Sequence, residues 1–127
     1  IRDFEAVRSK IDLFQPDYVF HLAAQAFVRK SVRNPLESIT TNVLGTANVL
    51  IPALASISVT GITIVTTDKV YENLGANLPF KESDKLGGQD PYSGSKAAAE
   101  LVVSSIRFSI SEVIFPNGTP GAGEPVN

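Results

Sequence analysis

Two residues four positions apart could do proton chemistry together, namely Tyr92 and Lys96 in the stretch Tyr92-Ser93-Gly94-Ser95-Lys96. Residues with this spacing share one face of a helix. A lysine ammonium beside a tyrosine phenol stabilises the phenolate and lowers the phenol's pKa from about 10. The phenolate could then take a proton from an alcohol. Many helices carry this spacing by chance, so a solvated helix face explains it more simply when it is taken alone.

A second group of polar residues, Thr66-Thr67-Asp68-Lys69, directly follows the apolar run Ile62-Thr63-Ile64-Val65. A hydroxyl, a carboxyl group and an amine at the end of a strand can supply an acid and a base together. The alternative interpretation is a polar turn that only ends the strand.

A third group, His21-Leu22-Ala23-Ala24-Gln25, follows the run Tyr18-Val19-Phe20. Small residues after a strand let a ligand approach the backbone closely. The alternative is a tightly packed turn, with the histidine satisfied in the core. No other histidine and no cysteine is present, so we expect no metal site.

Apolar spacing and capping residues predict three helices that could position these groups. The first covers residues 3–14, with Asp3 as N-cap. The second runs from Asn34 to about Ser56, and Pro52 should kink or shorten it. The third opens at Asp90. The faces expected to be buried comprise Leu36, Ile39, Val43, Leu50 and Leu54 on the second helix, and Leu101, Val102 and Ile106 on the third.

Two buried strands are expected between the helices, over residues 18–22 and 62–66, and a long loop over residues 71–90. Alternating helices and apolar strands predict an α/β fold, with a parallel sheet and flanking helices. Ligands bind such sheets outside the carboxyl ends of the strands. All three polar groups therefore belong to one expected site.

The bulk composition narrows the class of protein. The formal net charge is −2 at pH 7 and 43% of residues are hydrophobic, which favours a globular domain and no nucleic-acid partner. No uninterrupted apolar run reaches the roughly 18 residues that cross a bilayer, so we expect no membrane partner and a cytoplasmic location.

Taken together, the motifs resemble those of the extended short-chain dehydrogenases/reductases that act on nucleotide sugars, the NAD-dependent epimerase/dehydratase family. The likeness lies in H-L-A-A, T-N-V-x-G-T, T-D-x-V-Y and Y-x-x-x-K, and it runs from Ile1 to about Ser109. Residues 67–73, T-D-K-V-Y-E-N, and residues 86–96, L-G-G-Q-D-P-Y-S-G-S-K, are most similar to CDP-glucose 4,6-dehydratases.

The resemblance implies a Rossmann-type fold, NAD as cofactor and a nucleotide-sugar substrate. It implies a lyase of deoxysugar biosynthesis that forms a homo-oligomer when intact. The residues it places near the cofactor are Leu22, Ala23, Ala24, Gln25, Asn42, Thr66, Tyr92 and Lys96. For Asn42, a structural role is at least as consistent with its position as a contact with a ligand.

The resemblance also implies catalytic roles. Tyr92 would remove the proton of the sugar 4-hydroxyl, and Lys96 would hold the ribose. Thr67 would bind the 4-oxygen, and Asp68 would protonate the departing 6-hydroxyl. Lys69 would remove the C5 proton, in place of the glutamate of T-D-E relatives, and would have to be neutral to do so.

The sequence departs from the family pattern in ways that suggest a fragment. The glycine-rich turn that seats the cofactor pyrophosphate is not found in it. We expect residues 1–110 to be the central part of an NAD-binding domain, residues 111–127 to be an irregular tail, and the fragment to be inactive alone. A 4-epimerase, another nucleotide-sugar dehydratase, and an inactive truncated binding or scaffold module remain as alternatives.

Overall fold

The computed structural model describes residues 1–73, 75 and 79–114, with side chains described up to residue 109. Its elements, in chain order, are α1 (Phe4–Phe14), β1 (Tyr18–His21), α2 (Val28–Arg33), α3 (Pro35–Ile39), the π-helical turn η1 (Thr40–Leu44), α4 (Gly45–Ala55), β2 (Gly61–Ile64), the 3-10 turn η2 (Asp68–Val70) and α5 (Pro91–Ile114). Helices and strands alternate as the sequence predicts, and the α/β fold class is confirmed.

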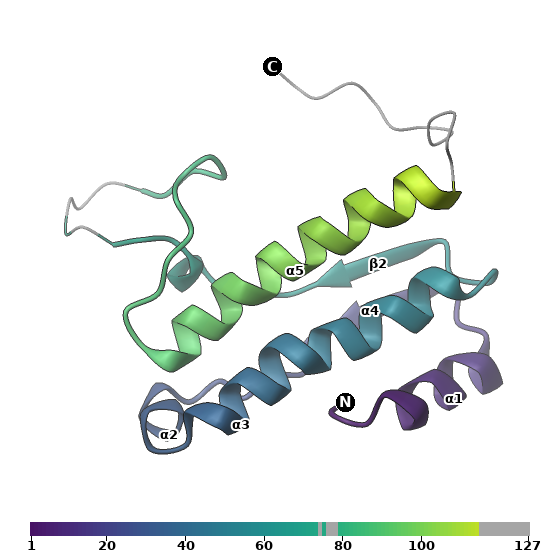
Figure 1. Cartoon of the computed structure of the whole chain (residues 1–127), viewed down its shortest axis with the longest axis horizontal. Coiled ribbons are helices and arrows are strands. Elements are labelled where there is room, and N and C mark those ends of the chain that lie inside the picture. Colours follow the sequence, from purple (N-terminus) through teal and green to yellow (C-terminus); the bar gives the residue numbers. More distant parts are fainter. Residues whose placement is uncertain (74, 76–78, 115–127) are drawn as a thin grey trace.

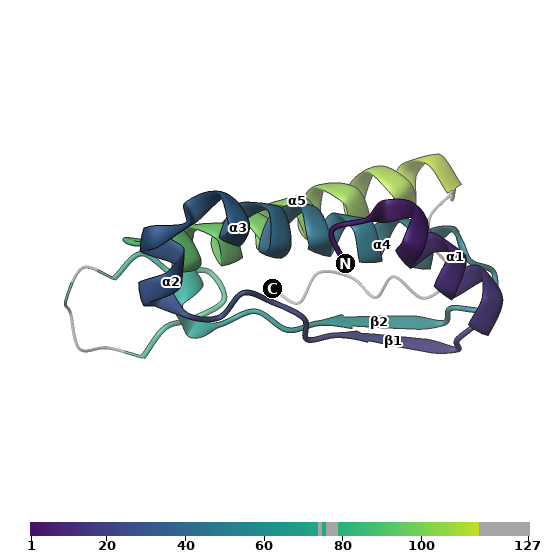
Figure 2. The same cartoon turned by 90° about the horizontal axis from the view of Figure 1, so that it is seen from below.

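The two strands form a parallel pair whose carboxyl ends lie side by side. Tyr18 pairs with Gly61 and His21 with Ile64, and the amide of Val65 donates to the carbonyl oxygen of His21 over 3.0 Å. Figure 2 shows that the labelled helices all lie on one side of the sheet. The segments that leave the two carboxyl ends therefore start next to each other, as the site requires.

Only one face of β1 is covered, so the expectation of a fully buried strand is wrong. His21 points inward and is buried, whereas Tyr18 and Phe20 are 48% and 67% exposed on the other face. The reason is that side chains alternate along a strand and the described helices pack on one face alone. Parallel sheets in α/β proteins are usually covered on both faces.

The first helix follows its local sequence signals. The Asp3 carboxylate accepts from the amide of Ala6 over 3.0 Å, as the predicted N-cap should. Buried Ile11 faces inward, and α1 packs against α4. The cap needs only neighbouring residues, and the apolar residue Ile11 is buried as α1 packs against α4, so the helix forms where the sequence predicts it.

The long second helix starts as predicted but breaks elsewhere. Asn34 caps it and Pro35 occupies its first turn. The irregularity is the π-helical turn η1, whereas Pro52 lies buried within α4. The extra residue of a π turn shifts the register between the residues before it and those after it, so one 3.6-residue period cannot run through the whole stretch. Leu36 and Ile39, which precede the turn, are 67% and 46% exposed, contrary to expectation, and Ser38 and Asn42 are buried instead.

Across that π turn, Pro35–Ala55 is long and apolar enough to cross a membrane by length and composition, which corrects the expectation that no stretch would be. Core helices of soluble proteins pass the same test. Here the stretch packs against α1, α5 and the sheet, and it holds Asn42 and Thr46 inside the molecule. Its apolar character is that of a packed core helix.

The last helix, α5, lies alongside α4 (Figure 1) and presents a small-residue face to the interior. Its buried side chains include Ser95, Lys96, Ala97 and Ala99, whereas Leu101 is 60% exposed, contrary to expectation. The helix also continues to Ile114, so the expected irregular tail cannot begin at residue 111. The remainder of that tail lies outside the described residues.

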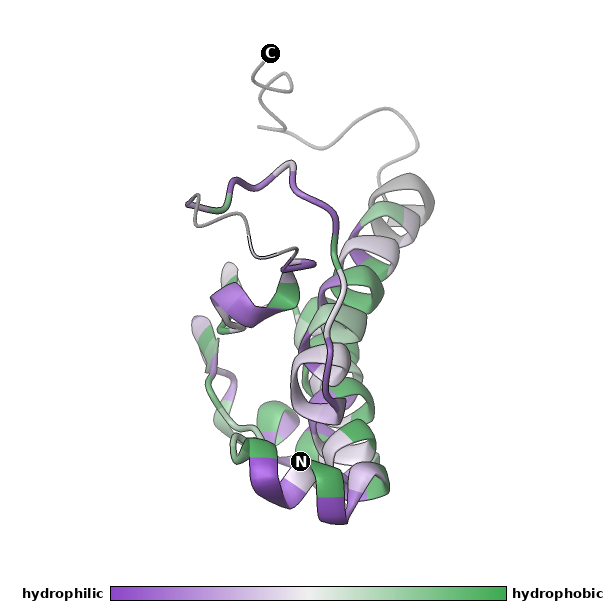
Figure 3. Ribbon diagram, turned by 90° about the vertical axis from the view of Figure 1, so that its left-hand side faces the viewer, coloured by the Kyte–Doolittle hydropathy of each residue, from purple (hydrophilic) through white to green (hydrophobic). Residues whose placement is uncertain are grey.

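The loop that precedes α5 is mostly hydrophilic (Figure 3). Its arms are joined by an isolated antiparallel bridge between Tyr71 and Leu86, and the amide of Gly87 donates to the Val70 carbonyl over 2.8 Å. A Cβ on Gly88 would lie 2.2 Å from the backbone nitrogen of Gly94. Glycine at position 88 therefore lets the end of the loop rest directly on the first turn of α5.

Candidate functional site

The amine of Lys96 reaches the carboxyl end of β2. Lys96 lies in the second turn of α5, its residue surface is 5% exposed, and Nζ donates to the carbonyl oxygen of Val65 over 2.8 Å. Burial lowers the pKa of this amine, and the nearby carboxylate of Glu100 opposes the shift by raising it. The tyrosine–lysine helix is thus fixed against the strand end that carries the second polar group.

A second contact fixes the same junction. Thr66 Oγ1 donates to Glu100 Oε1, which lies one helical turn beyond Lys96. Thr66 was expected near a cofactor, whereas Glu100 was not singled out from the sequence. The spacing of four residues from Lys96 was the available signal for Glu100, because it puts both side chains on one helix face.

Tyr92 lies in the first turn of α5 and is half-buried. Its backbone amide donates to Asp90 Oδ1 over 2.9 Å and to Ser31 Oγ over 3.1 Å. Because both residues lie in the helix α5, the positions of Tyr92 and Lys96 share one face, as their spacing predicts. The structure therefore holds the backbone of Tyr92 firmly and leaves part of its side chain accessible.

The segment Thr67-Asp68-Lys69 forms the turn η2 at the end of β2. Thr67 Oγ1 donates to Asp68 Oδ1 over 3.1 Å and accepts weakly from the Lys69 amide at 3.4 Å. Asp68 and Lys69 are exposed. They are consequently free to meet a ligand, whereas Thr67 also organises the turn.

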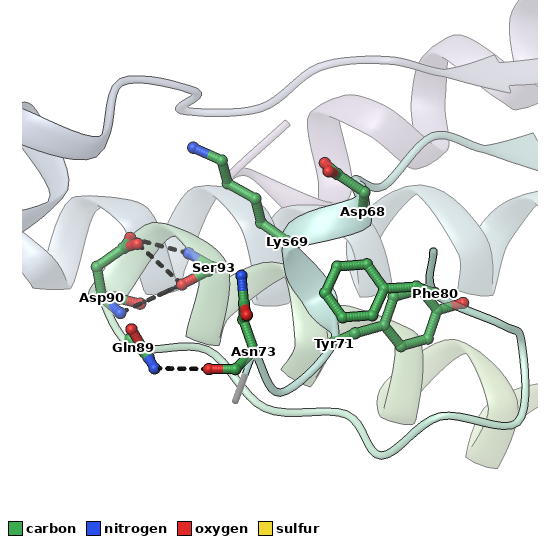
Figure 4. A pocket seen from close by; sticks show the side chains of 8 residues that line it. All are labelled: Asp68, Lys69, Tyr71, Asn73, Phe80, Gln89, Asp90 and Ser93. Atoms are coloured by element: carbon green, nitrogen blue, oxygen red, sulfur yellow. Dashed lines mark hydrogen bonds between the residues drawn. The ribbon is translucent and has the colours of Figure 1, made fainter. Parts of the chain in front are cut away.

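Asp68 and Lys69 line a pocket of about 260 Å³ at this edge of the sheet (Figure 4). Across the pocket, the rings of Tyr71 and Phe80 stack with centroids 5.2 Å apart. The remaining lining residues are Asn73, Gln89, Asp90 and Ser93, and neither Tyr92 nor Lys96 is among them. Sequence reasoning missed the aromatic pair and the polar wall, because their proximity depends on the path of the loop.

The loop after β1 divides into an exposed half and a buried half. Leu22 is 66% exposed and Ala23 is also exposed, with Ala24 half-buried, so a ligand could approach the backbone there. Gln25 is buried, and its side chain donates to Ser38 Oγ over 2.8 Å and accepts from the Phe27 amide over 2.7 Å. The Gln25 side chain therefore makes its hydrogen bonds to neighbouring residues of the protein.

Asn42 joins this loop to α5 from the π turn. It is fully buried, with Oδ1 accepting from the Gln25 amide over 2.8 Å. Its Nδ2 donates to the Gln25 carbonyl over 3.1 Å and to Ser95 Oγ over 2.9 Å. An amide nitrogen has two protons, so both are used. Asn42 thus has the structural role that the sequence left open beside a ligand contact.

His21 is part of the same interior. Its Nε2 lies 3.0 Å from Thr46 Oγ1, and that hydroxyl donates to the Asn42 carbonyl over 2.6 Å. Since the single hydroxyl proton is spent there, Nε2 must be the protonated nitrogen that donates to Thr46. Burial lowers the pKa of His21, and the charge of Lys96 lowers it further. In the described part of the chain, no cluster of His, Asp or Glu could hold a metal ion.

Comparisons with known proteins agree on one group of enzymes. A family model described as GDP-mannose 4,6 dehydratase matches residues 1–116. The CDP-glucose 4,6-dehydratase of Salmonella typhimurium is 43% identical over 109 residues, which cover 86% of this chain and 30% of that protein. A probable dTDP-glucose 4,6-dehydratase of Sinorhizobium fredii is 36% identical over 108 residues, covering 79% of this chain and 31% of that protein.

A solved structure gives the same indication. The UDP-glucose 4-epimerase of Thermus thermophilus, in complex with NAD, superposes with a TM-score of 0.74 and 30% identity. The match covers 85% of this chain and 35% of that chain. The chain thus spans about a third of the length of the proteins it matches.

Proposed function

Because this chain belongs to the GDP-mannose 4,6-dehydratase family of extended short-chain dehydrogenases/reductases, we propose that it forms part of an NAD-dependent nucleotide-sugar 4,6-dehydratase, a lyase that acts on CDP-glucose. The observation that carries the proposal is the bond from Lys96 Nζ to the Val65 carbonyl. It holds the tyrosine–lysine helix against the strand end where Thr67, Asp68 and Lys69 begin. Identity to the Salmonella CDP-glucose 4,6-dehydratase supports the choice of sugar nucleotide.

The residues at this edge of the sheet fit a dinucleotide. Ala23, two residues after β1, is exposed and carries only a methyl group, so a ligand could approach the backbone there. A lysine ammonium has three protons, and the Val65 bond uses one, so Lys96 can also donate to ribose hydroxyls. When bound, NAD⁺ would accept the C4 hydride of the sugar and return it to C6 after water has left, while C5 regains a proton.

The proposed role of Tyr92 is to take the proton of the sugar 4-hydroxyl as C4 becomes a ketone. Thr67 hydrogen-bonds the 4-oxygen. The ketone acidifies the neighbouring C5 proton, which Lys69 removes in its neutral form. Asp68 gives a proton to the 6-hydroxyl, which departs as water. The overall change converts a hexose into its 4-keto-6-deoxy form plus one water, with no net oxidation.

The positions of Asp68 and Lys69 support dehydration over simple oxidation and reduction. Both line the pocket of about 260 Å³, and both are exposed to a ligand there. A 4-epimerase would need the tyrosine and lysine but neither an acid for the C6 hydroxyl nor a base for C5. The stacked Tyr71 and Phe80 rings offer an apolar wall against which a sugar could lie.

The test places this chain in a complete enzyme. In a chimera, it replaces the matching 109-residue segment of the Salmonella CDP-glucose 4,6-dehydratase. Incubation with CDP-glucose and NAD⁺ should yield CDP-4-keto-6-deoxyglucose, detected by mass spectrometry as the loss of one water. A folded, NAD-binding chimera that only inverts C4, or that leaves CDP-glucose unchanged, would refute the proposal.

A further inference from the structure

A serine from a short helix far away in the sequence holds the backbone of Tyr92. Ser31 lies in α2 and is 0% exposed. Its Oγ accepts from the Tyr92 amide over 3.1 Å and donates to the Val28 carbonyl over 2.7 Å. Because the hydroxyl proton goes to Val28, the lone pairs of Ser31 are directed toward other donors, and the Tyr92 amide is one of them.

This bond is more than the capping of a free amide. The Asp90 carboxylate already accepts from the amides of Tyr92 and Ser93, over 2.9 and 3.1 Å. The first turn of α5 thus has an N-cap from its own segment. What Ser31 adds is a tertiary connection between that turn and α2.

The carbonyl group of Tyr92 is also connected to the segment that follows β1. It accepts from Ser95 Oγ over 2.7 Å, and Ser95 Oγ accepts from Asn42 Nδ2 over 2.9 Å. Asn42 in turn holds both backbone groups of Gln25. Both polar backbone atoms of Tyr92 are therefore connected to the segment 25–31, which follows β1.

We propose that Ser31 is a positioning residue for Tyr92, fixing the first turn of α5 to the segment that follows β1. The loop proposed to receive the dinucleotide then holds a constant position relative to the phenol. The catalytic consequence rests on the proposed function, whereas the connection itself does not. Ser31 touches no reacting atom, so it acts through the backbone of Tyr92 alone.

Amide hydrogen exchange in the 127-residue chain tests the connection without any activity. Ser31→Ala removes one of two acceptors and should speed exchange of the Tyr92 amide about tenfold, the effect of one net hydrogen bond. Ser38→Ala is the matched control, because Ser38 is also 0% exposed but bonds to Gln25 instead. Equal Tyr92 exchange in the parent and Ser31→Ala would overturn the proposal.

Kinetics of the chimera test the consequence. Ser31→Ala should lower kcat about tenfold while KM for CDP-glucose stays within about twofold, since an interaction that orients a base is felt at the transition state. Ser58→Ala, at the opposite end of the sheet, should change neither constant. An unchanged kcat together with faster Tyr92 exchange would overturn the positioning role. An inactive but folded parent chimera would refute the proposed function alone, and the exchange result would still decide the connection.

Discussion

Lys96 and Val65 are joined by a hydrogen bond from a buried amine to a backbone carbonyl, 2.8 Å long, across the junction of α5 and β2. A strand-end carbonyl is a fixed acceptor, so the amine has a defined position before any ligand arrives. Burial also lowers the pKa of the amine. The bond thus organises the candidate site, whereas burial makes the charge of Lys96 costly.

Lys96→Met should separate folding from function. Methionine fills similar space and removes a buried charge, but it also leaves the Val65 carbonyl without its donor, so the two effects should largely cancel and the free energy of unfolding should change by no more than about 2 kcal/mol. The dehydratase activity of the chimera should be lost. Urea denaturation of the 127-residue chain and the product assay measure the two effects, and a strongly destabilised variant would show that Lys96 is structural.

The pH dependence of this variant provides a further check. With a pKa below its ordinary value in the folded state, Lys96 binds a proton more readily in the unfolded chain. The stability of the parent should therefore rise with pH up to about 10.4, the ordinary pKa of lysine, and Lys96→Met should lack that component.

His21 should make the chain sensitive to mild acid. Its pKa is lowered in the folded state, so the unfolded chain takes up the proton first as the pH falls below about 6.5. The free energy of unfolding should fall as the pH drops below that value. The contribution of His21 should be fully lost once the pH lies below its pKa in the folded state. His21→Gln keeps a donor for Thr46 but does not titrate. If the free energies of unfolding of the parent and of His21→Gln change in parallel from pH 8 to pH 5, His21 is not the group responsible.

Asn42 should be essential to the fold. Asn42→Ala leaves the amide and carbonyl of Gln25 buried without partners, which should cost about 3 kcal/mol. Asn42→Asp should cost more, because it buries a carboxylate where two donated hydrogen bonds are needed. Denaturant titration measures both, and a loss below about 0.5 kcal/mol in each would show that the π turn does not depend on this side chain.

Two glycines near Tyr92 should respond in opposite directions to substitution by alanine. At Gly88 the new Cβ would lie 2.2 Å from the Gly94 nitrogen and 2.4 Å from the Ser93 carbonyl carbon, so backbone must move. At Gly94 nothing lies within 4 Å, and alanine should stabilise the helix by up to about 1 kcal/mol. Relative to the parent, the midpoint of thermal unfolding should be lower for Gly88→Ala and higher for Gly94→Ala. Shifts of the same sign in both variants would contradict the close contact described at Gly88.

Local signals made part of this architecture predictable. Asp3 and Asn34 cap helices through side chains that need only their neighbours, and the alternation of elements predicts a parallel sheet. The π turn was not predictable, because it accompanies bonds from Asn42 to Gln25 and Ser95, 17 and 53 residues away. The exposure of Phe20 depends similarly on which faces the helices cover.

The same distinction applies to the site. Tyr92 and Lys96 could be paired from their spacing, and Asp68 and Lys69 from their place after a strand. The connection of Ser31 to Tyr92 spans 61 positions and follows no sequence period. The pocket wall formed by Tyr71 and Phe80 depends on how the loop returns to α5, so no spacing rule identifies it.

The most direct test of the proposed dehydratase is rapid mixing of the Asp68→Asn chimera with CDP-glucose and NAD⁺. Asparagine keeps the shape of the side chain but cannot supply the proton that the C6 hydroxyl needs to leave. Loss of one general acid typically costs about 10²- to 10⁴-fold in rate. NADH absorbance should therefore appear at the parent rate and persist, with almost no 4-keto-6-deoxy product. Dehydration at the parent rate would contradict the account, because Thr67, Asp68 and Lys69 would then form only a structural turn.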